Sequence, residues 1–217
     1  MSGRDTVLAR VRAALGEGAA AGEPVPMART YRRVDEAARD AIMERFVRRV
    51  GDYGAAVHRV SAERLSATIG EVCGRRGGGA FVIPADLPAD WLPDGLERLS
   101  DDGGLDYRQL DRSAGVITGC AVAVAETGTI MLDGGAGQGR RAITLLPDYH
   151  LCVVRADQIV GLVPEAIARL ADAGRAGRPV TLISGPSATA DIELSRVQGV
   201  HGPRTLEVII VDGPVSA

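Results

Sequence analysis

The stretch that decides the fold is Gly119–Arg141, which reads GCAVAVAETGTIMLDGGAGQGRR. Two apolar runs, Ala121–Ala125 and Thr129–Leu132, lie on either side of the polar break Glu126–Gly128. Short apolar runs bounded by turn residues predict buried strands. We therefore expect two strands that meet at this break and are followed by a glycine-rich turn. A carboxylate at such a junction is held near strand ends, where open α/β sheets tend to place their sites.

The rest of the chain predicts an α/β fold with a mixed, mainly parallel sheet that is flanked by helices. From Val57 onward, strand-like runs alternate with helical patterns, which is typical of a parallel sheet with helices on both faces. Two helices are expected before it, at Arg4–Leu15 and Asp35–Val50, with a Gly/Pro-rich linker between them. We divide the chain into an N-terminal helix and linker, residues 1–34, and one α/β domain, residues 35–217.

Several later segments carry definite expectations. Asp86–Gly104 is rich in Pro, Asp and Gly and predicts a loop with weak helix. Pro164 suits the first position of a helix that ends at Gly174. Strands are expected at Pro179–Ser184 and Thr205–Asp212, and a helix is expected at Ala188–Val197.

The composition excludes several classes of protein. The chain has 217 residues, a net charge of −3 and no apolar run near the roughly 18–20 residues that span a bilayer. We therefore expect a cytoplasmic protein with no membrane span, and the net charge gives no basic footprint for nucleic acid. The three cysteines form no CxxC pair, so we expect no zinc or iron–sulfur cofactor and no metal site in this chain.

The chain contains no lysine, so all 25 basic residues are arginine. This excludes Schiff-base chemistry, pyridoxal-phosphate attachment and the lysine of a P-loop. An anion must therefore be held by arginine, by backbone N–H groups or by a helix N-terminus.

Glu126 and the glycine turn each allow a structural and a functional interpretation. Glu126 is either a strand-end carboxylate paired with an arginine or a nucleophile or acid/base held among apolar strands. Gly134–Arg141 (GGAGQGRR) does not match the dinucleotide motif G-x-G-x-x-G, because an arginine stands where the last glycine belongs. It is either a flexible turn or a nest of N–H groups with an arginine beside it.

The other polar residues lie in Ser184–Arg204. SGPSATAD, from Ser184 to Asp191, follows a predicted strand and opens a predicted helix, so it either binds an anion or caps the helix. His201 lies beside an arginine in a Gly/Pro-rich loop, and His150 is a second candidate for proton transfer. The candidate catalytic residues are Glu126, His150 and His201, and the candidate ligand-binding residues are Thr127, Gly128, Gly137, Gln138, Gly139, Arg140, Ser184, Gly185, Ser187, Asp191 and Arg204.

Five segments together resemble one family. AETGTIMLD, GAGQGRRA, LLPDYHLCVV, ISGPSATADIE and GVHGPRTLEVIIVD, which span about Val116 to Asp212, resemble the lactate-utilisation proteins, most closely the small C-type members that consist of one LUD domain. The resemblance implies a fold like the ribose-phosphate isomerase and CoA-transferase group. It also implies a role in oxidising L-lactate to pyruvate beside two partner proteins that carry iron–sulfur clusters. Glu126-Thr127-Gly128 is similar to the glutamate turn of CoA transferases, in which the glutamate attacks thioesters.

These observations leave three hypotheses. The first is a component of an L-lactate-oxidising system in which the candidate residues form one pocket for a small carboxylate or a phosphorylated ligand. The second is an assembly subunit that organises the iron–sulfur partners, with its N-terminal helix as the contact. The third is a standalone small-molecule enzyme of the isomerase or CoA-transferase type.

Overall fold

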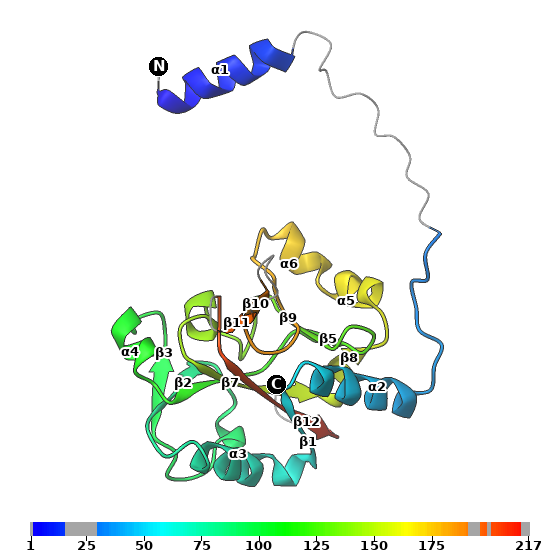
Figure 1. Ribbon diagram of the computed structural model, residues 1–217, viewed down its shortest axis with the longest axis vertical. Coiled ribbons are helices and arrows are strands. Elements are labelled where there is room, and N and C mark those ends of the chain that lie inside the picture. The colour runs from blue at the N-terminus through cyan, green and yellow to red at the C-terminus, as the bar shows by residue number, and fades with distance from the viewer. Residues whose placement is uncertain (1, 16–29, 191–195, 199–200, 214–217) are drawn as a thin grey trace. The chain divides into compact units, whose positions relative to one another are not determined.

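The computed structural model describes residues 2–15, 30–190, 196–198 and 201–213 (Figure 1). The chain divides into two compact units, Met1–Tyr31 and Arg32–Ala217. In the first unit, helix α1 (Gly3–Leu15) buries none of its residues. Its exposed apolar side chains are Val7, Leu8, Val11 and Leu15. No helix in the described ranges has both the length and the apolar character needed to cross a membrane.

A six-stranded parallel sheet forms the centre of the second unit (Figure 1). Its strands are β1 (Ala56–Ser61), β2 (Phe81–Pro84), β3 (Arg98–Asp101), β4 (Gly115–Thr118), β7 (Tyr149–Arg155) and β12 (Thr205–Asp212). They lie in the order β1-β12-β7-β4-β2-β3, and every neighbouring pair is parallel. The central strands are nearly continuous apolar runs, because a parallel sheet is buried on both faces. The predicted α/β class with a mainly parallel sheet is confirmed.

The decisive stretch builds a second sheet of four strands. These are β5 (Val122–Val124), β6 (Thr129–Leu132), β8 (Ile159–Val160) and β9 (Thr181–Ile183), in the order β8-β5-β6-β9. The two predicted strands are confirmed as the antiparallel pair β5 and β6, which meet at Glu126–Gly128. Gly128 has φ +60°, and a Cβ there would lie 2.8 Å from the backbone carbonyl carbon of Arg49. The tight turn therefore requires glycine at this position.

Helices cover both faces of the parallel sheet, as predicted. The α-helices of this unit are α2 (Arg39–Asp52), α3 (Leu65–Gly74), α4 (Tyr107–Asp111), α5 (Val163–Arg169) and α6 (Ala171–Arg175). Short 3₁₀ turns are η2 (Ala62–Arg64), η3 (Ala89–Trp91), η4 (Arg141–Thr144) and η5 (Ala156–Gln158). One core cluster joins α3 to the parallel sheet, and another joins α2 to apolar residues of both sheets. A third joins α5 to the four-stranded sheet, so the unit is layered.

One local prediction is wrong and another is confirmed only in part. The helix expected at Ala188–Val197 is replaced by two antiparallel strands, β10 (Ala188–Ala190) and β11 (Arg196–Gln198). Local sequence pattern does not reveal a partner strand, and here the β-branched Thr189 pairs with the β-branched Val197. The weak helix expected within the loop Asp86–Gly104 is confirmed as η3, but the segment also contains the edge strand β3, which pairs in parallel with β2.

Candidate functional site

The glycine turn that follows β6 is held by its own side chains. Asp133 Oδ1 accepts hydrogen bonds from the Gly135 N–H (3.0 Å) and from Gln138 Nε2 (2.9 Å). In return, the Asp133 N–H donates to Gln138 Oε1 over 2.7 Å. Asp133 and Gln138 are both buried, so these bonds are shielded from water. Gln138 therefore shapes the turn from within.

The same turn is anchored to the carboxyl ends of the parallel strands. The Gly119 N–H, after β4, donates to the Gly137 carbonyl over 2.7 Å. The Gly137 N–H in turn donates to Asp86 Oδ2, after β2, over 3.1 Å. Two of the N–H groups of the predicted nest, those of Gly135 and Gly137, are thus bonded within the chain.

Arg140 is engaged by a buried carboxylate. Its Nε and Nη2 bond the two oxygens of Asp101 over 2.9 and 3.0 Å, and Nη2 also donates to the Leu105 carbonyl over 2.6 Å. The Asp101 side chain is 1% exposed. Burial alone would raise the pKa of Asp101, but the Arg140 bonds and charge outweigh it and lower that pKa. Arg140 therefore fixes the turn to the end of β3.

One cavity beside the turn, which we call the histidine cavity, collects many of the predicted residues. It has a volume of about 240 Å³. Its polar lining consists of Arg141, Thr144, His150, Thr181, Ser184, Ser187 and His201, with Gly185 among the remaining lining residues. His150 lies near the amino end of β7, and the Gly202–Pro203 segment precedes β12, so the cavity opens at the amino edge of these strands.

Hydrogen bonds link the elements around the histidine cavity. His150 is buried, and its Nε2 lies 2.7 Å from the Thr118 hydroxyl. Arg141 donates to the Thr144 hydroxyl (3.2 Å) and to the His201 carbonyl (3.3 Å). The His201 N–H donates to the Ser187 hydroxyl over 3.1 Å. The loop before β12 is therefore tied to both Arg141 and Ser187.

The charge of the histidine cavity is positive. Burial, and then the nearby charge of Arg141, lower the pKa of His150 to about 4, so this imidazole is neutral at pH 7. Burial around the Arg141 guanidinium lowers its pKa too, although arginine stays charged. No aspartate or glutamate is among the described residues that line this cavity. It can therefore hold a small anion.

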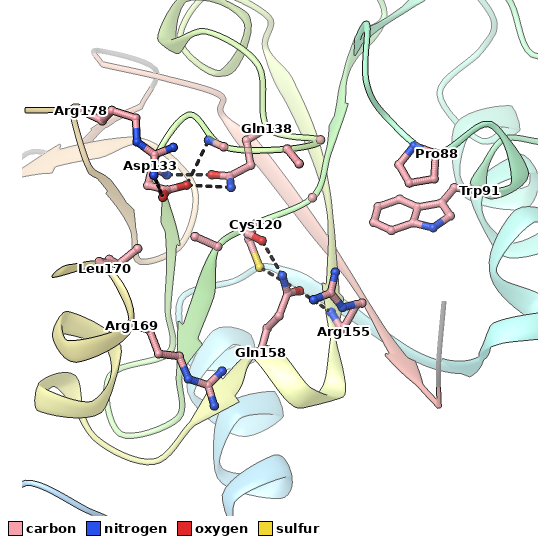
Figure 2. A pocket seen from close by; sticks show the side chains of 15 residues that line it. Pro88, Trp91, Cys120, Asp133, Gln138, Arg155, Gln158, Arg169, Leu170 and Arg178 are labelled. Atoms are coloured by element: carbon pink, nitrogen blue, oxygen red, sulfur yellow. Dashed lines mark hydrogen bonds and ion pairs between the residues drawn. The ribbon is translucent and has the colours of Figure 1, made fainter. Parts of the chain in front are cut away.

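A second and larger cavity, which we call the arginine cavity, is lined by Asp133 and Gln138 of the turn region (Figure 2). Its volume is about 510 Å³. The lining includes Pro88, Trp91, Gly119, Cys120, Asp133, Gln138, Arg155, Gln158, Arg169, Leu170 and Arg178. Residues that follow β2, β4 and β7 line it, so it sits at the carboxyl ends of the parallel strands. Open α/β sheets commonly bind ligands at that edge.

The remaining predicted residues lie elsewhere. The Glu126 side chain is 46% exposed, lies 3.7 Å from Arg32 and lines neither cavity. Thr127 contacts the Thr129 hydroxyl at 2.7 Å, and Thr129 contacts Ser184 at 2.8 Å, so a hydroxyl chain connects the β5–β6 turn to the rim of the histidine cavity. Arg204 pairs with Asp148 at 3.5 Å and is exposed. Asp191 lies outside the described residues.

Of the arginine cavity, the sequence patterns identified Gly137 and Gln138 of the glycine turn but none of the arginines. The three arginines come from the end of β7, from α5 and from the segment before β9. Each is locally an ordinary surface residue, and only the fold brings them together. The position of Arg155 at the carboxyl end of a parallel strand is the one feature that could have pointed to them.

Comparisons with known proteins agree with the fold. The LUD domain model matches residues 43–211. Lactate utilization protein C of Deinococcus radiodurans is 51% identical over 173 residues, which cover 80% of this chain and 81% of the relative. Lactate utilization protein C of Geobacillus sp. (strain WCH70) is 32% identical over 171 residues, which cover 70% of each.

A solved structure is also similar. The crystal structure of a DUF162 family protein from Deinococcus radiodurans matches with a TM-score of 0.70 and 46% sequence identity, covering 81% of this chain and 99% of that one. The resemblance drawn from the five segments is thereby confirmed. This chain belongs to the LUD domain family.

Proposed function

We propose that this chain is a cytoplasmic component of an L-lactate utilisation system, in which L-lactate is oxidised to pyruvate, and that it binds the small carboxylate in the histidine cavity. The names of its relatives support the lactate-utilisation role. In this proposal two iron–sulfur lactate-utilisation proteins take the electrons. The three cysteines of this chain form no CxxC pair, which is why the proposal places the clusters in the partners.

The observation that carries the ligand proposal is the unbalanced charge of the histidine cavity. Arg141 is its cation, the described lining holds no acidic side chain, and Ser184 and Ser187 add hydroxyls. An arginine guanidinium matches the geometry of a carboxylate, and a charge-assisted hydrogen bond is stronger than a neutral one. A volume of about 240 Å³ lies below the roughly 300–1,000 Å³ typical of drug-sized ligands, so a small metabolite suits it.

His150 gives the cavity a neutral polar group beside the cation. With a pKa of about 4 it carries no proton charge at pH 7, so it suits the hydroxyl of lactate or the ketone oxygen of pyruvate. We assign Arg141 to the carboxylate and His150 to the neighbouring oxygen. His201, which is exposed on the same cavity, is our candidate for exchanging a proton with solvent.

A thermal-shift titration with L-lactate and pyruvate tests this proposal. A ligand at about 100 times its dissociation constant adds roughly 2.7 kcal/mol of stability. For a domain of this size the melting temperature should then rise by several degrees. Arg141→Gln should abolish the rise. Arg175→Gln, which changes an exposed arginine paired with Asp172 outside the cavity, should keep it.

The ligand proposal fails if neither acid raises the melting temperature of the wild-type chain, or if Arg175→Gln loses the response as fully as Arg141→Gln. Growth of a deletion strain on L-lactate, complemented with the same variants, tests the physiological role separately. There, Arg141→Gln should fail to restore growth, whereas Arg175→Gln should restore it.

The exposed apolar residues of α1 favour a second role, docking of the partner proteins. Val7, Val11 and Leu15 expose 60%, 48% and 63% of their surface. Apolar side chains that a helix does not bury within its own unit are suited to a groove on another protein. Deleting residues 1–26 should abolish co-purification with the iron–sulfur partners while pyruvate still raises the melting temperature. Unchanged co-purification would remove α1 from the proposal.

A further inference from the structure

We propose that the arginine cavity binds a nucleoside diphosphate or triphosphate. This site is separate from the histidine cavity, in which we place the small carboxylate ligand. Nothing in this inference rests on the proposed function, because different residues line the two cavities. The location of the arginine cavity, the charges of its lining and its apolar wall support this proposal.

The arginine cavity lies at the carboxyl ends of three parallel strands. Pro88 and Trp91 follow β2, Cys120 follows β4, and Arg155 ends β7. His150 and Arg155 lie five residues apart on β7, about 17 Å at strand spacing, so the two cavities are well separated. The Gly119 and Gly137 backbones meet at this edge, and the resulting hollow of about 510 Å³ is of the size that takes a nucleotide.

Arginines dominate the charged lining of the arginine cavity. Three arginines from three elements border the cavity, and Asp133 is the one acidic residue of the described lining. Asp133 already pairs with Arg178 at 3.1 Å and accepts from the turn. Arg155 donates from Nε to the Asp157 carboxylate (3.2 Å), and Arg169 donates from Nη1 to the Asp157 carbonyl (2.9 Å). Each guanidinium has further N–H donors, and three arginines against the carboxylates of Asp133 and Asp157 leave a positive charge at the cavity, which favours an anionic ligand.

Pro88 and Trp91 form an apolar wall of the arginine cavity. In the view of Figure 2, Pro88 and Trp91 stand on one side of the cavity and Arg169 and Arg178 on the other. A ring edge of Trp91 comes close to Gly119, where an added Cβ would lie 3.6 Å from its Cη2 atom. Trp91 is otherwise buried, so a planar base against Pro88 and the exposed edge of Trp91, with its phosphates toward Arg169 and Arg178, matches this division. A six-heavy-atom acid such as lactate would leave most of the cavity empty.

The sole tryptophan of the chain makes the test direct. Trp91 lines the cavity and no other tryptophan contributes to the emission, so its fluorescence can report binding at this site. Titrating the full chain with ADP should quench or shift that emission saturably, and adenosine and pyrophosphate should each bind at least about tenfold more weakly than ADP. Arg169→Gln and Arg178→Gln should each weaken ADP binding about tenfold, which equals about 1.4 kcal/mol. Arg175→Gln is the matched control and should bind ADP as the wild type does.

Three results would overturn the inference. They are the absence of a saturable response to millimolar ADP, equal binding of pyrophosphate and ADP, and equal weakening by Arg175→Gln and Arg178→Gln. Arg169 is exposed, so its variant keeps the test valid if Arg178→Gln fails to fold. Arg141→Gln should leave ADP binding unchanged, which separates this site from the carboxylate site.

Discussion

The histidine cavity and the arginine cavity flank the same glycine turn, yet their polar groups are held in different ways. In the histidine cavity, Arg141 makes hydrogen bonds longer than 3 Å to a hydroxyl and a carbonyl, and the central imidazole is buried and neutral. In the arginine cavity, each cation has an oxygen partner from the chain, and those partners include the carboxylates of Asp133 and Asp157. One cavity holds a single cation without an acid, and the other spreads three cations over a larger hollow.

This difference indicates how one fold can discriminate between anions. A single arginine beside neutral polar groups suits one compact carboxylate. Several arginines at separate positions suit a charge that is spread over a longer molecule. Four experiments test this difference between the two cavities, and we describe them in order of decreasing expected effect.

Removing the support of the shared turn should damage both cavities. Asp101→Ala leaves Arg140 without its buried carboxylate, and breaking a buried pair in this way costs about 3–5 kcal/mol. Because Arg140 is partly exposed, we expect the lower end, about 3 kcal/mol, in urea unfolding. Asp172→Ala, which breaks an exposed pair with Arg175, is the control and should change stability by less than about 1 kcal/mol. A loss as small for Asp101→Ala would contradict the anchoring of the turn.

Acidification should destabilise the chain through the histidine cavity. The pKa of His150 falls from 6.5 to about 4 on folding, so between these values the unfolded state binds more protons and stability falls as pH falls. The full shift corresponds to at most about 3 kcal/mol. His150→Gln should lose less stability than the wild type between pH 6.5 and 4, whereas Arg175→Gln, which changes an exposed pair with Asp172, should keep the wild-type pH dependence. Parallel curves for wild type and His150→Gln would refute the pKa assignment.

Filling the histidine cavity should change the ionisation of His150. A bound carboxylate favours the charged imidazole, so pyruvate should raise its pKa by about one unit, or about 1.4 kcal/mol. The measurement is an NMR pH titration of the imidazole with and without pyruvate. ADP serves as the comparison and should leave the titration unchanged, since His150 does not line the arginine cavity. An equal shift with both compounds would mean that they share a site.

The smallest effect is expected at Glu126. Its pair with Arg32 is exposed and long, at 3.7 Å, so Glu126→Gln should change the free energy of unfolding by less than about 0.5 kcal/mol. Binding of pyruvate and ADP should both persist in the thermal-shift and fluorescence titrations. Loss of either ligand would assign Glu126 to that site and would revive the CoA-transferase interpretation.

The sequence was most informative where one short segment determines its own structure. The segments before and after Glu126–Gly128 form the predicted strands, because each of them is a short run of mostly apolar residues. The helix predicted at Ala188–Val197 is wrong because Ala188–Ala190 pairs with Arg196–Gln198, and local periodicity does not reveal such a pairing. Ser184, Ser187 and His201 came together with His150, as a site at the ends of strands would require.

The rest of the site depends on distant contacts. Arg140 lies in a suggestive motif, but Asp101, on an edge strand that the pattern missed, engages it. Arg141, one residue later, is the arginine that lines the histidine cavity. Neighbouring arginines in a turn point in different directions, and only the surrounding contacts decide which one meets a ligand.

The glycine turn has a thermodynamic consequence. Gln138 lines the arginine cavity and Arg141 lines the histidine cavity, three residues apart on one segment whose ends are anchored to the sheet. Because these anchors hold the segment in one arrangement, a ligand in one cavity should leave the ligand affinity of the other cavity unchanged. By reciprocity, the factor by which a nucleotide alters carboxylate affinity must equal the factor by which the carboxylate alters nucleotide affinity. The anchored turn therefore predicts a factor close to one in both directions.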